Sequence, residues 1–261
     1  MNHALWVSKT GLQAQDTRLQ IIANNLANVN TVGFKRDRAV FEDLFYRTET
    51  QPGAQNSDNS TAAGVQIGTG TRVVGTQKVH TGGSLQTTGQ ALDVAIMGAG
   101  FLQVELASGE TAYTRAGQLR LDQEGRLTNA QGLPLLPAIS IPTEATGVTI
   151  AENGVISVTT ADAPNGTEVG QLMLANFINP AGLLALGDNL FQETAASGTP
   201  TEGEPNTESL GKIRQNTLEG SNVQAVEEMV EMIAAQRTYE MNTKVLTAAD
   251  SMMQNLAQAA R

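Results

Sequence analysis

The sequence predicts an α+β protein, mainly β, with one long helix at each end of the chain. Two observations lead to this prediction. Residues 3–30 and 221–260 repeat apolar side chains at helical spacing, whereas the stretch from about 66 to 190 alternates short Val, Ile and Leu runs with Gly and Pro. Residues 48–64 and 192–211 are polar and nearly lack large apolar side chains, so we expect loops there.

The N-terminal helix has a stripe of leucines seven residues apart. Its members are Leu5, Leu12, Leu19 and Leu26, and Ile22 and Val29 follow two of them at a spacing of three. This spacing keeps apolar side chains on one face of a helix that supercoils slightly against a partner. A run rich in asparagine and closed by Gly33 indicates the end of the helix, because Asn and Gly tolerate left-handed backbone.

The C-terminal helix is predicted to begin after Ser221, where a hydroxyl and, three residues later, Gln224 form a capping-box pattern. At ~1.5 Å per residue it could reach roughly 55 Å. Its main apolar stripe, spaced by three and four residues, is Ala225, Met232, Ala235, Tyr239, Leu246, Ala249, Met253, Leu256 and Ala260. A second stripe beside it is Val226, Val230 and Ile233.

Both terminal helices need a partner, because an isolated helix is marginally stable in water. Pairing the first helix with the last would bring the chain ends together. The periodicity leaves two arrangements open, a helix hairpin packed on the protein's own core and packing between molecules.

Three turns organise the predicted β region. Asp122–Gly125 joins two short runs as a hairpin with a glycine-containing loop, and Asn153-Gly154 predicts a two-residue hairpin turn in which both residues need positive φ. Residues 171–178 predict a further strand that ends at Asn179-Pro180. Aromatic residues make up only 4% of the chain, so we expect a core of Val, Ile, Leu, Met and Ala.

The composition gives little material for a catalytic, metal or cofactor site. The chain has no cysteine, and its two histidines, His3 and His80, have no candidate metal ligands close by in sequence. Adjacent acidic residues such as Glu227 and Glu228 would point in different directions on a helix, about 100° apart. We therefore expect no enzyme activity, no metal and no cofactor.

Charge and hydropathy exclude further functions. The formal charge of −10 opposes binding to phosphate backbones, so nucleic acid is not an expected partner. The sequence has no run of about 18 apolar residues, so we expect no membrane-spanning helix. The N-terminus lacks the basic start and apolar run of a cleaved signal peptide, so export would use another route.

Four segments together resemble the bacterial flagellar rod and hook family of axial proteins. The first is Asn24-Asn25-Leu26-Ala27-Asn28-Val29-Asn30-Thr31-Val32-Gly33-Phe34-Lys35, whose motif residues are Asn24, Asn25, Asn28, Gly33 and Phe34. The others are residues 83–101, residues 113–117 with the following hairpin, and residues 221–242. They span nearly the whole chain in the family's order. Residues 38–44, 51–55 and the added stretch 46–64 resemble the subgroup that builds the distal rod.

The resemblance implies a subunit that stacks helically into a hollow shaft and transmits torque from motor to hook. It implies a terminal helical coiled-coil domain (1–32 and 221–261), a connector region (33–82 and 186–220) and a β-rich outer domain (83–185). Implied partners are other copies of the chain, proximal rod proteins, the hook protein, the P-ring and L-ring proteins and the flagellar export apparatus. The implied location is the basal body, spanning the periplasm towards the outer membrane.

With this resemblance, the apolar stripes become candidate self-assembly seams. The candidate residues are Leu5, Leu12, Leu19, Ile22, Leu26, Val226, Val230, Ile233, Tyr239, Leu246, Met253 and Leu256. Before assembly these faces would lack partners, so we expect disordered chain ends in the monomer. The alternatives are a proximal rod or hook subunit of the same family, a periplasmic peptidoglycan-acting enzyme, and a monomeric secreted binding protein.

Overall fold

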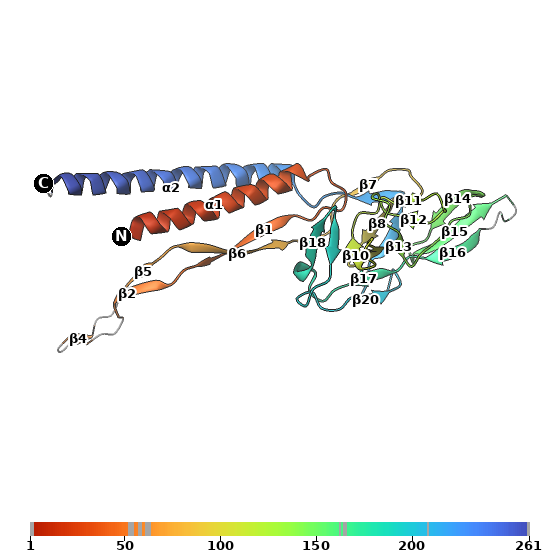
Figure 1. Ribbon diagram of the computed structural model, residues 1–261, viewed down its shortest axis with the longest axis horizontal. Coiled ribbons are helices and arrows are strands. Elements are labelled where there is room, and N and C mark those ends of the chain that lie inside the picture. The colour runs from red at the N-terminus through yellow and green to blue at the C-terminus, as the bar shows by residue number, and fades with distance from the viewer. Residues whose placement is uncertain are drawn as a thin grey trace. The chain divides into compact units, whose positions relative to one another are not determined.

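The computed structural model describes residues 3–51, 55–56, 59–60, 64–161, 163, 166–207 and 209–259. Most of its regular structure is strands, with one helix near each end of the chain, α1 (His3–Ala27) and α2 (Ala225–Ala259), as predicted (Figure 1). The chain divides into two compact units. Unit 1 contains Met1–Ala27, Asp37–Gln77 and Gln224–Arg261, and unit 2 contains Asn28–Arg36 and Lys78–Val223.

Unit 1 combines the two helices with antiparallel ribbons. Strand β1 (Asp37–Asp43) pairs with β6 (Thr71–Lys78), β2 (Tyr46–Thr50) with β5 (Val65–Gly68), and β3 (Gln55–Asn56) with β4 (Asn59–Ser60). The prediction of a loop across 48–64 is therefore wrong at 48–50, 55–56 and 59–60. The β2 side chains are exposed, so the strand depends on backbone pairing rather than on an apolar face. Residues 52–54, 57–58 and 61–63 of that stretch lie outside the described residues.

The predicted cap of the last helix is wrong. Helix α2 begins at Ala225, and the Ser221 hydroxyl instead accepts a hydrogen bond from the Val223 N–H at 3.2 Å. The side chain of Asn222 accepts from the Arg36 N–H at 2.7 Å and donates to the Val79 carbonyl at 2.7 Å. These tertiary hydrogen bonds hold residues 221–223 in unit 2, so α2 begins later in the sequence than predicted.

Unit 2 is built around one antiparallel sheet with the strand order β18-β19-β10-β9-β17-β20, and β13 also pairs with β9. The strands are β9 (Phe101–Glu105), β10 (Thr111–Thr114), β13 (Leu135–Leu136), β17 (Leu174–Asn176), β18 (Leu184–Gly187), β19 (Leu190–Gln192) and β20 (Thr201–Gly203). A 3-10 turn, η1 (Pro180–Gly182), precedes β18. Because β20 pairs with β17, the prediction of a loop across 192–211 is wrong at 201–203.

Smaller sheets complete unit 2. They pair β7 (Leu85–Thr87) with β22 (Thr217–Glu219), β8 (Val94–Met97) with β21 (Lys212–Gln215), and β11 (Arg120–Leu121) with β12 (Leu127–Thr128). Strands β14 (Ala145–Ile150), β15 (Val155–Thr160) and β16 (Thr167–Gln171) form a three-stranded sheet.

The predicted hairpins are present, with two corrections. Gly125 has φ +75° in the turn between β11 and β12, as the loop requires. In the turn before β15, Gly154 has φ +82° but Asn153 is not left-handed, so this is not the predicted two-residue turn. The strand predicted over 171–178 is two strands, because β16 pairs with β15 whereas β17 pairs with β9 in a different sheet.

The core of unit 2 is mainly aliphatic, as the composition predicted. Buried Val, Ile and Leu side chains from most of its sheets form one cluster. A second cluster contains Phe101, Tyr113, Phe177 and Phe191, with Tyr113 and Phe177 meeting edge to face at 4.8 Å between ring centroids. The prediction of an aliphatic core missed this second cluster, because these four aromatic residues lie far apart in the sequence and only the fold brings them together.

Candidate functional site: the terminal helices and the 24–35 motif

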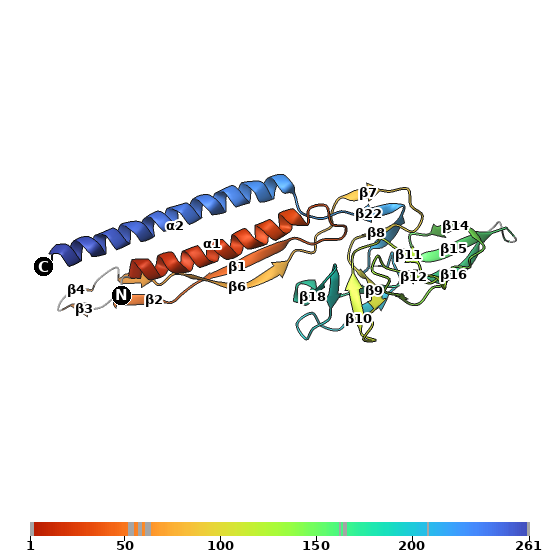
Figure 2. The ribbon, with the colours of Figure 1, turned by 45° about the horizontal axis from the view of Figure 1, so that its top comes forward.

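Helices α1 and α2 lie side by side in unit 1 and run in opposite directions (Figures 1 and 2). Arg18 pairs with Glu231 at 3.3 Å, and Asn25 near the end of α1 contacts Glu228 near the start of α2. At Gly11 an added Cβ would lie 3.2 Å from the Asn242 side chain. A methyl group at residue 11 would therefore require the Asn242 side chain to shift by a few tenths of an ångström.

The leucine stripe of α1 is half-buried rather than fully buried. Leu5, Leu12, Leu19 and Leu26 are partly exposed, whereas Ile22 is only 2% exposed. Of the α1 candidates, Ile22 packs fully within the single chain. The leucines keep accessible apolar surface.

The inner face of α2 carries small or half-buried side chains. Ala235 and Ala249 are buried, and Leu246 is half-buried. The adjacent acids diverge as predicted, since Glu228 is 2% exposed while Glu227 is exposed. The inner face thus contains only part of the predicted main stripe.

The second predicted stripe is open to solvent. Val226, Met229, Val230 and Ile233 are 70%, 46%, 61% and 50% exposed. Steps of three and four residues place these four side chains on one side of α2, opposite Glu228 and Ala235. We call this group the open face of α2. Tyr239 and Met253 are also exposed, at 40% and 43%, and the Leu256 side chain lies outside the described residues.

In unit 1 the second residue of the motif, Asn25, fixes the end of α1. Asn25 is 1% exposed. Its side chain accepts from the Asp37 N–H at 2.9 Å and donates to the Asp37 carbonyl at 2.9 Å and to Glu228 at 3.2 Å. It therefore joins α1, β1 and α2. Asn24 is exposed, with its amide 3.5 Å from the Asp37 carboxylate.

In unit 2 the motif forms a tight turn. Thr31 donates its hydroxyl to the Asn28 side chain at 3.1 Å, and Gly33 has φ +71°. A Cβ at Gly33 would lie 2.8 Å from the backbone of Arg115 and Ala116, so glycine is required both by conformation and by space. The Gly33 N–H donates to the Glu219 carbonyl at 2.8 Å.

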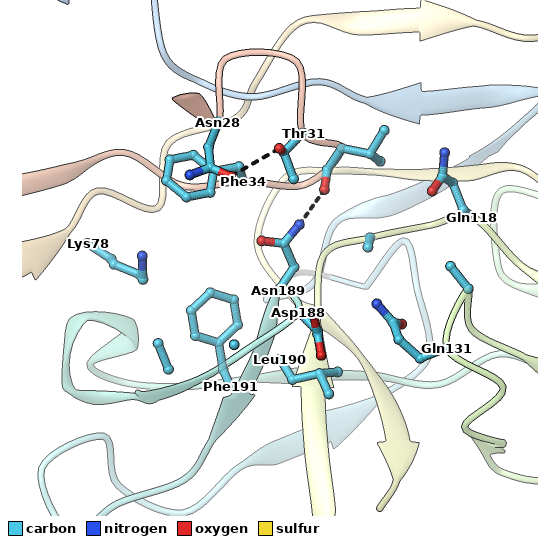
Figure 3. Close-up of a pocket in the computed structure, with 15 residues that line it drawn as sticks. Asn28, Thr31, Phe34, Lys78, Gln118, Gln131, Asp188, Asn189, Leu190 and Phe191 are labelled. Atoms are coloured by element: carbon cyan, nitrogen blue, oxygen red, sulfur yellow. Dashed lines mark hydrogen bonds between the residues drawn. The ribbon is translucent and has the colours of Figure 1, made fainter. Parts of the chain in front are cut away.

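The turn borders a cavity of about 410 Å³ (Figure 3). Phe34, which is 7% exposed, lies on its wall under the Lys78 ammonium, 5.2 Å from the ring centroid. Asn189, in left-handed backbone, donates to the Val32 carbonyl at 2.7 Å, as Figure 3 shows. The lining is mixed and carries no group of side chains suited to catalysis, so we assign the cavity no chemistry.

Sequence reasoning missed a buried charged cluster in unit 2. Glu219 pairs with Lys35 at 2.6 Å and with Arg115 at 3.3 Å, and the three side chains are 1%, 0% and 4% exposed. Burial lowers the pKa of Lys35 and that of Arg115, and Glu219 opposes both shifts. Burial also acts to raise the pKa of Glu219, but the two cations outweigh it and the pKa is lowered. Lys35 ends the motif quoted above, which is the one signal that could have identified it.

The described part of the chain contains neither a cluster of metal-ligating side chains nor a helix that could span a membrane. No group of three or more His, Cys, Asp or Glu residues is arranged to hold a metal there. Neither described helix is long and apolar enough to cross a membrane. His3 contacts Arg47 at 3.0 Å, and His80 packs edge-on against Phe101 and Phe191.

Three family descriptions match separate segments. The flagella basal body rod protein family matches residues 5–35, the flagellar hook protein FlgE/F/G D1 domain matches 95–158, and the flagellar basal body rod FlgEFG protein C-terminal family matches 214–259. The first contains the motif and the last contains the open face of α2.

Curated relatives match almost end to end. The flagellar basal-body rod protein FlgG of Buchnera aphidicola from Acyrthosiphon pisum is 49% identical over 98% of both chains. FlgG of Agrobacterium fabrum is 47% identical over 95% of this chain and 96% of its own. The rod protein FlgF of Caulobacter vibrioides is 34% identical over 100% of this chain and 96% of its own. This chain belongs to the flagellar basal-body rod protein family.

Proposed function

We propose that the chain is a structural subunit that assembles helically into the distal part of the flagellar rod, the hollow drive shaft between motor and hook. Membership of the rod family supports a structural role, and the higher identity to relatives named FlgG than to the one named FlgF supports the distal position. The observation that carries the proposal is the open face of α2, which has no cover in the single chain.

Assembly would bury this face against neighbouring copies. Burying one Val, Ile or Met side chain contributes roughly 1.5–3 kcal/mol, so four on one helix side provide a strong seam. A contact between unlike surfaces of identical subunits, repeated without closure, gives a helical filament. The half-buried α1 stripe of Leu5, Leu12, Leu19 and Leu26 would lie in the same layer, with α1 and α2 acting as a paired coiled coil.

The proposed functional division has three parts. The terminal helices, within 1–32 and 221–261, would form the inner tube. Residues 33–82 and 186–220 would connect them to an outer β-rich domain, 83–185. The ribbons in unit 1 support the connector role, because paired strands resist bending better than single chain.

The proposed partners follow from the position in the rod. They are other copies of the chain, the proximal rod proteins, the hook protein and the P-ring and L-ring proteins, after passage through the flagellar export apparatus. The proposed location is the basal body across the periplasm towards the outer membrane. We also propose that the chain has no enzyme activity.

Electron microscopy of concentrated purified protein tests the structural role. Rods of uniform width are expected, and a solution of monomers at every concentration would contradict it. Complementation separates the distal from the proximal position. The gene for this chain should restore hook assembly to a bacterium without its distal rod subunit but not to one without a proximal subunit. Clearing of a peptidoglycan gel would instead support the enzyme alternative.

A further inference from the structure

The cluster of Lys35, Arg115 and Glu219 holds two buried cations and one carboxylate. Arg115 also donates to the Gly98 carbonyl at 2.7 Å, and Lys35 donates to the Thr81 carbonyl at 2.8 Å. Glu219 accepts in addition from the Gly83 N–H at 2.9 Å. The anion that the structure pairs with both cations is Glu219. A buried cation without a counter-ion is strongly destabilising, so the core around it depends on this one carboxylate.

The carboxylate comes from far along the chain. Glu219 lies 184 residues after Lys35 and 104 residues after Arg115. It ends β22, the last strand before α2. Strand β8 and the turn after it supply the carbonyls around Arg115. They lie about 120 residues before Glu219, which neutralises Arg115, and this interval is on the order of a whole domain.

The segment that carries Glu219 docks along the motif turn and the chain after Lys78. Strand β22 pairs with β7, and the Gly220 N–H donates to the Ser84 carbonyl at 2.7 Å. A Cβ at Gly83 would meet the Gly220 carbonyl at far below contact distance, so two backbones touch here without side chains between them. The Asn222 side chain adds bonds to Arg36 and Val79. The docked segment thus covers the cluster as well as neutralising it.

We propose that Glu219 couples the docking of β22 to completion of the core. When β22 docks, its carboxylate neutralises Lys35 and Arg115 and so allows unit 2 to bury both cations. Until the 217–223 segment docks, both cations stay in water and the core next to them stays open. Formation of unit 2 is thereby coupled to the C-terminal segment that leads directly into α2. This inference concerns the folding of the single chain and does not depend on the proposed function.

Three full-chain variants test the proposal. Glu219→Gln keeps the size of residue 219, but it replaces one accepting oxygen by a donating amide and leaves two buried cations without a counter-ion. Glu152→Gln is the matched control, because the same change is made at an exposed ion pair with Lys212 in the same unit. A triple variant, Lys35→Met with Arg115→Met and Glu219→Leu, removes all three charges and keeps similar volumes.

Hydrogen exchange measured by mass spectrometry on β8, β9 and β10 is the readout. Glu219→Gln should lower protection of these strands roughly 150- to 5,000-fold, the factor expected from breaking a buried pair. The Glu152→Gln control should stay within about threefold of the unmodified chain. The triple variant should regain most of the lost protection, because no uncompensated charge remains.

Pulse labelling during refolding tests the order of events. Amides of β8 and β9 should become protected together with those of β22. Protection of β8 and β9 clearly before β22 would overturn the proposal, as would a Glu219→Gln variant that matches its control. If Glu219→Gln fails to fold, the triple variant decides: recovery supports the charge mechanism, and equal failure refutes it.

Discussion

His80 should make unit 2 less stable in mild acid. Its ring lies edge-on to Phe101 and Phe191, with centroid distances of 5.6 Å to each. Burial, together with the nearby cations Lys35, Arg115 and Lys78, lowers the pKa of His80 from 6.5 to about 4, while a hydrogen bond to the Pro180 carbonyl opposes the shift. The folded state therefore excludes a proton that the unfolded chain accepts.

The size and sign of the effect follow from these two pKa values. Above pH 6.5 both states are neutral at His80 and the stability is at its maximum. As the pH falls from 6.5 to about 4 the unfolded state binds the extra proton, and each pH unit costs about 1.4 kcal/mol. The full interval costs about 3 kcal/mol, of which about 2 kcal/mol is reached between pH 7 and pH 5.

Urea unfolding of unit 2, monitored through hydrogen exchange of β9 and β10, measures how its stability changes with pH. At ~2 kcal/mol per molar urea, the midpoint should fall by about 1 M from pH 7 to pH 5. His80→Gln should remove most of the shift whatever its stability at pH 7, because the titrating group is gone. His3→Gln, with its histidine in unit 1, should retain it. An equal shift in His80→Gln would refute the reasoning.

Three other predictions concern the motif and the helices. In urea unfolding, Gly33→Ala should destabilise unit 2 by more than about 2 kcal/mol, because of the left-handed backbone and the contact with residues 115–116. The control Gly132→Ala, at a residue with φ +85° and open space around it, should cost only about 1 kcal/mol. Equal losses would show that space at Gly33 is unimportant. Asn25→Ala should remove three hydrogen bonds and cost about 2–3 kcal/mol, seen as faster exchange in β1, and the exposed Asn24→Ala should cost less than about 0.5 kcal/mol; the reverse ranking would contradict the assignment. Helix content by circular dichroism should rise when monomers assemble, and equal content in both states would contradict the expectation of disordered ends.

The fold class could be predicted because periodicity is a local property. The repeats at both ends gave α1 and α2, and Gly125 and Gly154 marked real turns. The strands at 37–50 could not be predicted, since their exposed side chains show no clear alternation and their pairing with β5 and β6 is nonlocal. The start of α2 was misplaced because tertiary bonds to Asn222 outweigh a local capping pattern.

The candidate site divides in the same way. Apolar spacing predicted which residues share a face, but it could not tell the buried Ile22 from the exposed Ile233, since both are equally apolar. Asn25 and Gly33 could be placed in the motif, while their partners Glu228, Arg115 and Glu219 come from distant segments. The buried cluster was missed because charged residues are normally exposed, and only the fold brings three of them together.

Polymer formation by single-residue variants of the open face tests the central claim most directly. Ile233 is 50% exposed, so replacing it should leave the monomer folded. Ile233→Asp should abolish rods in electron microscopy at concentrations where the unmodified chain forms them, because a charge would be buried in the seam. Ile233→Leu should still form rods, and both variants should keep the hydrogen-exchange protection of unit 2. Normal rods from Ile233→Asp would contradict the account.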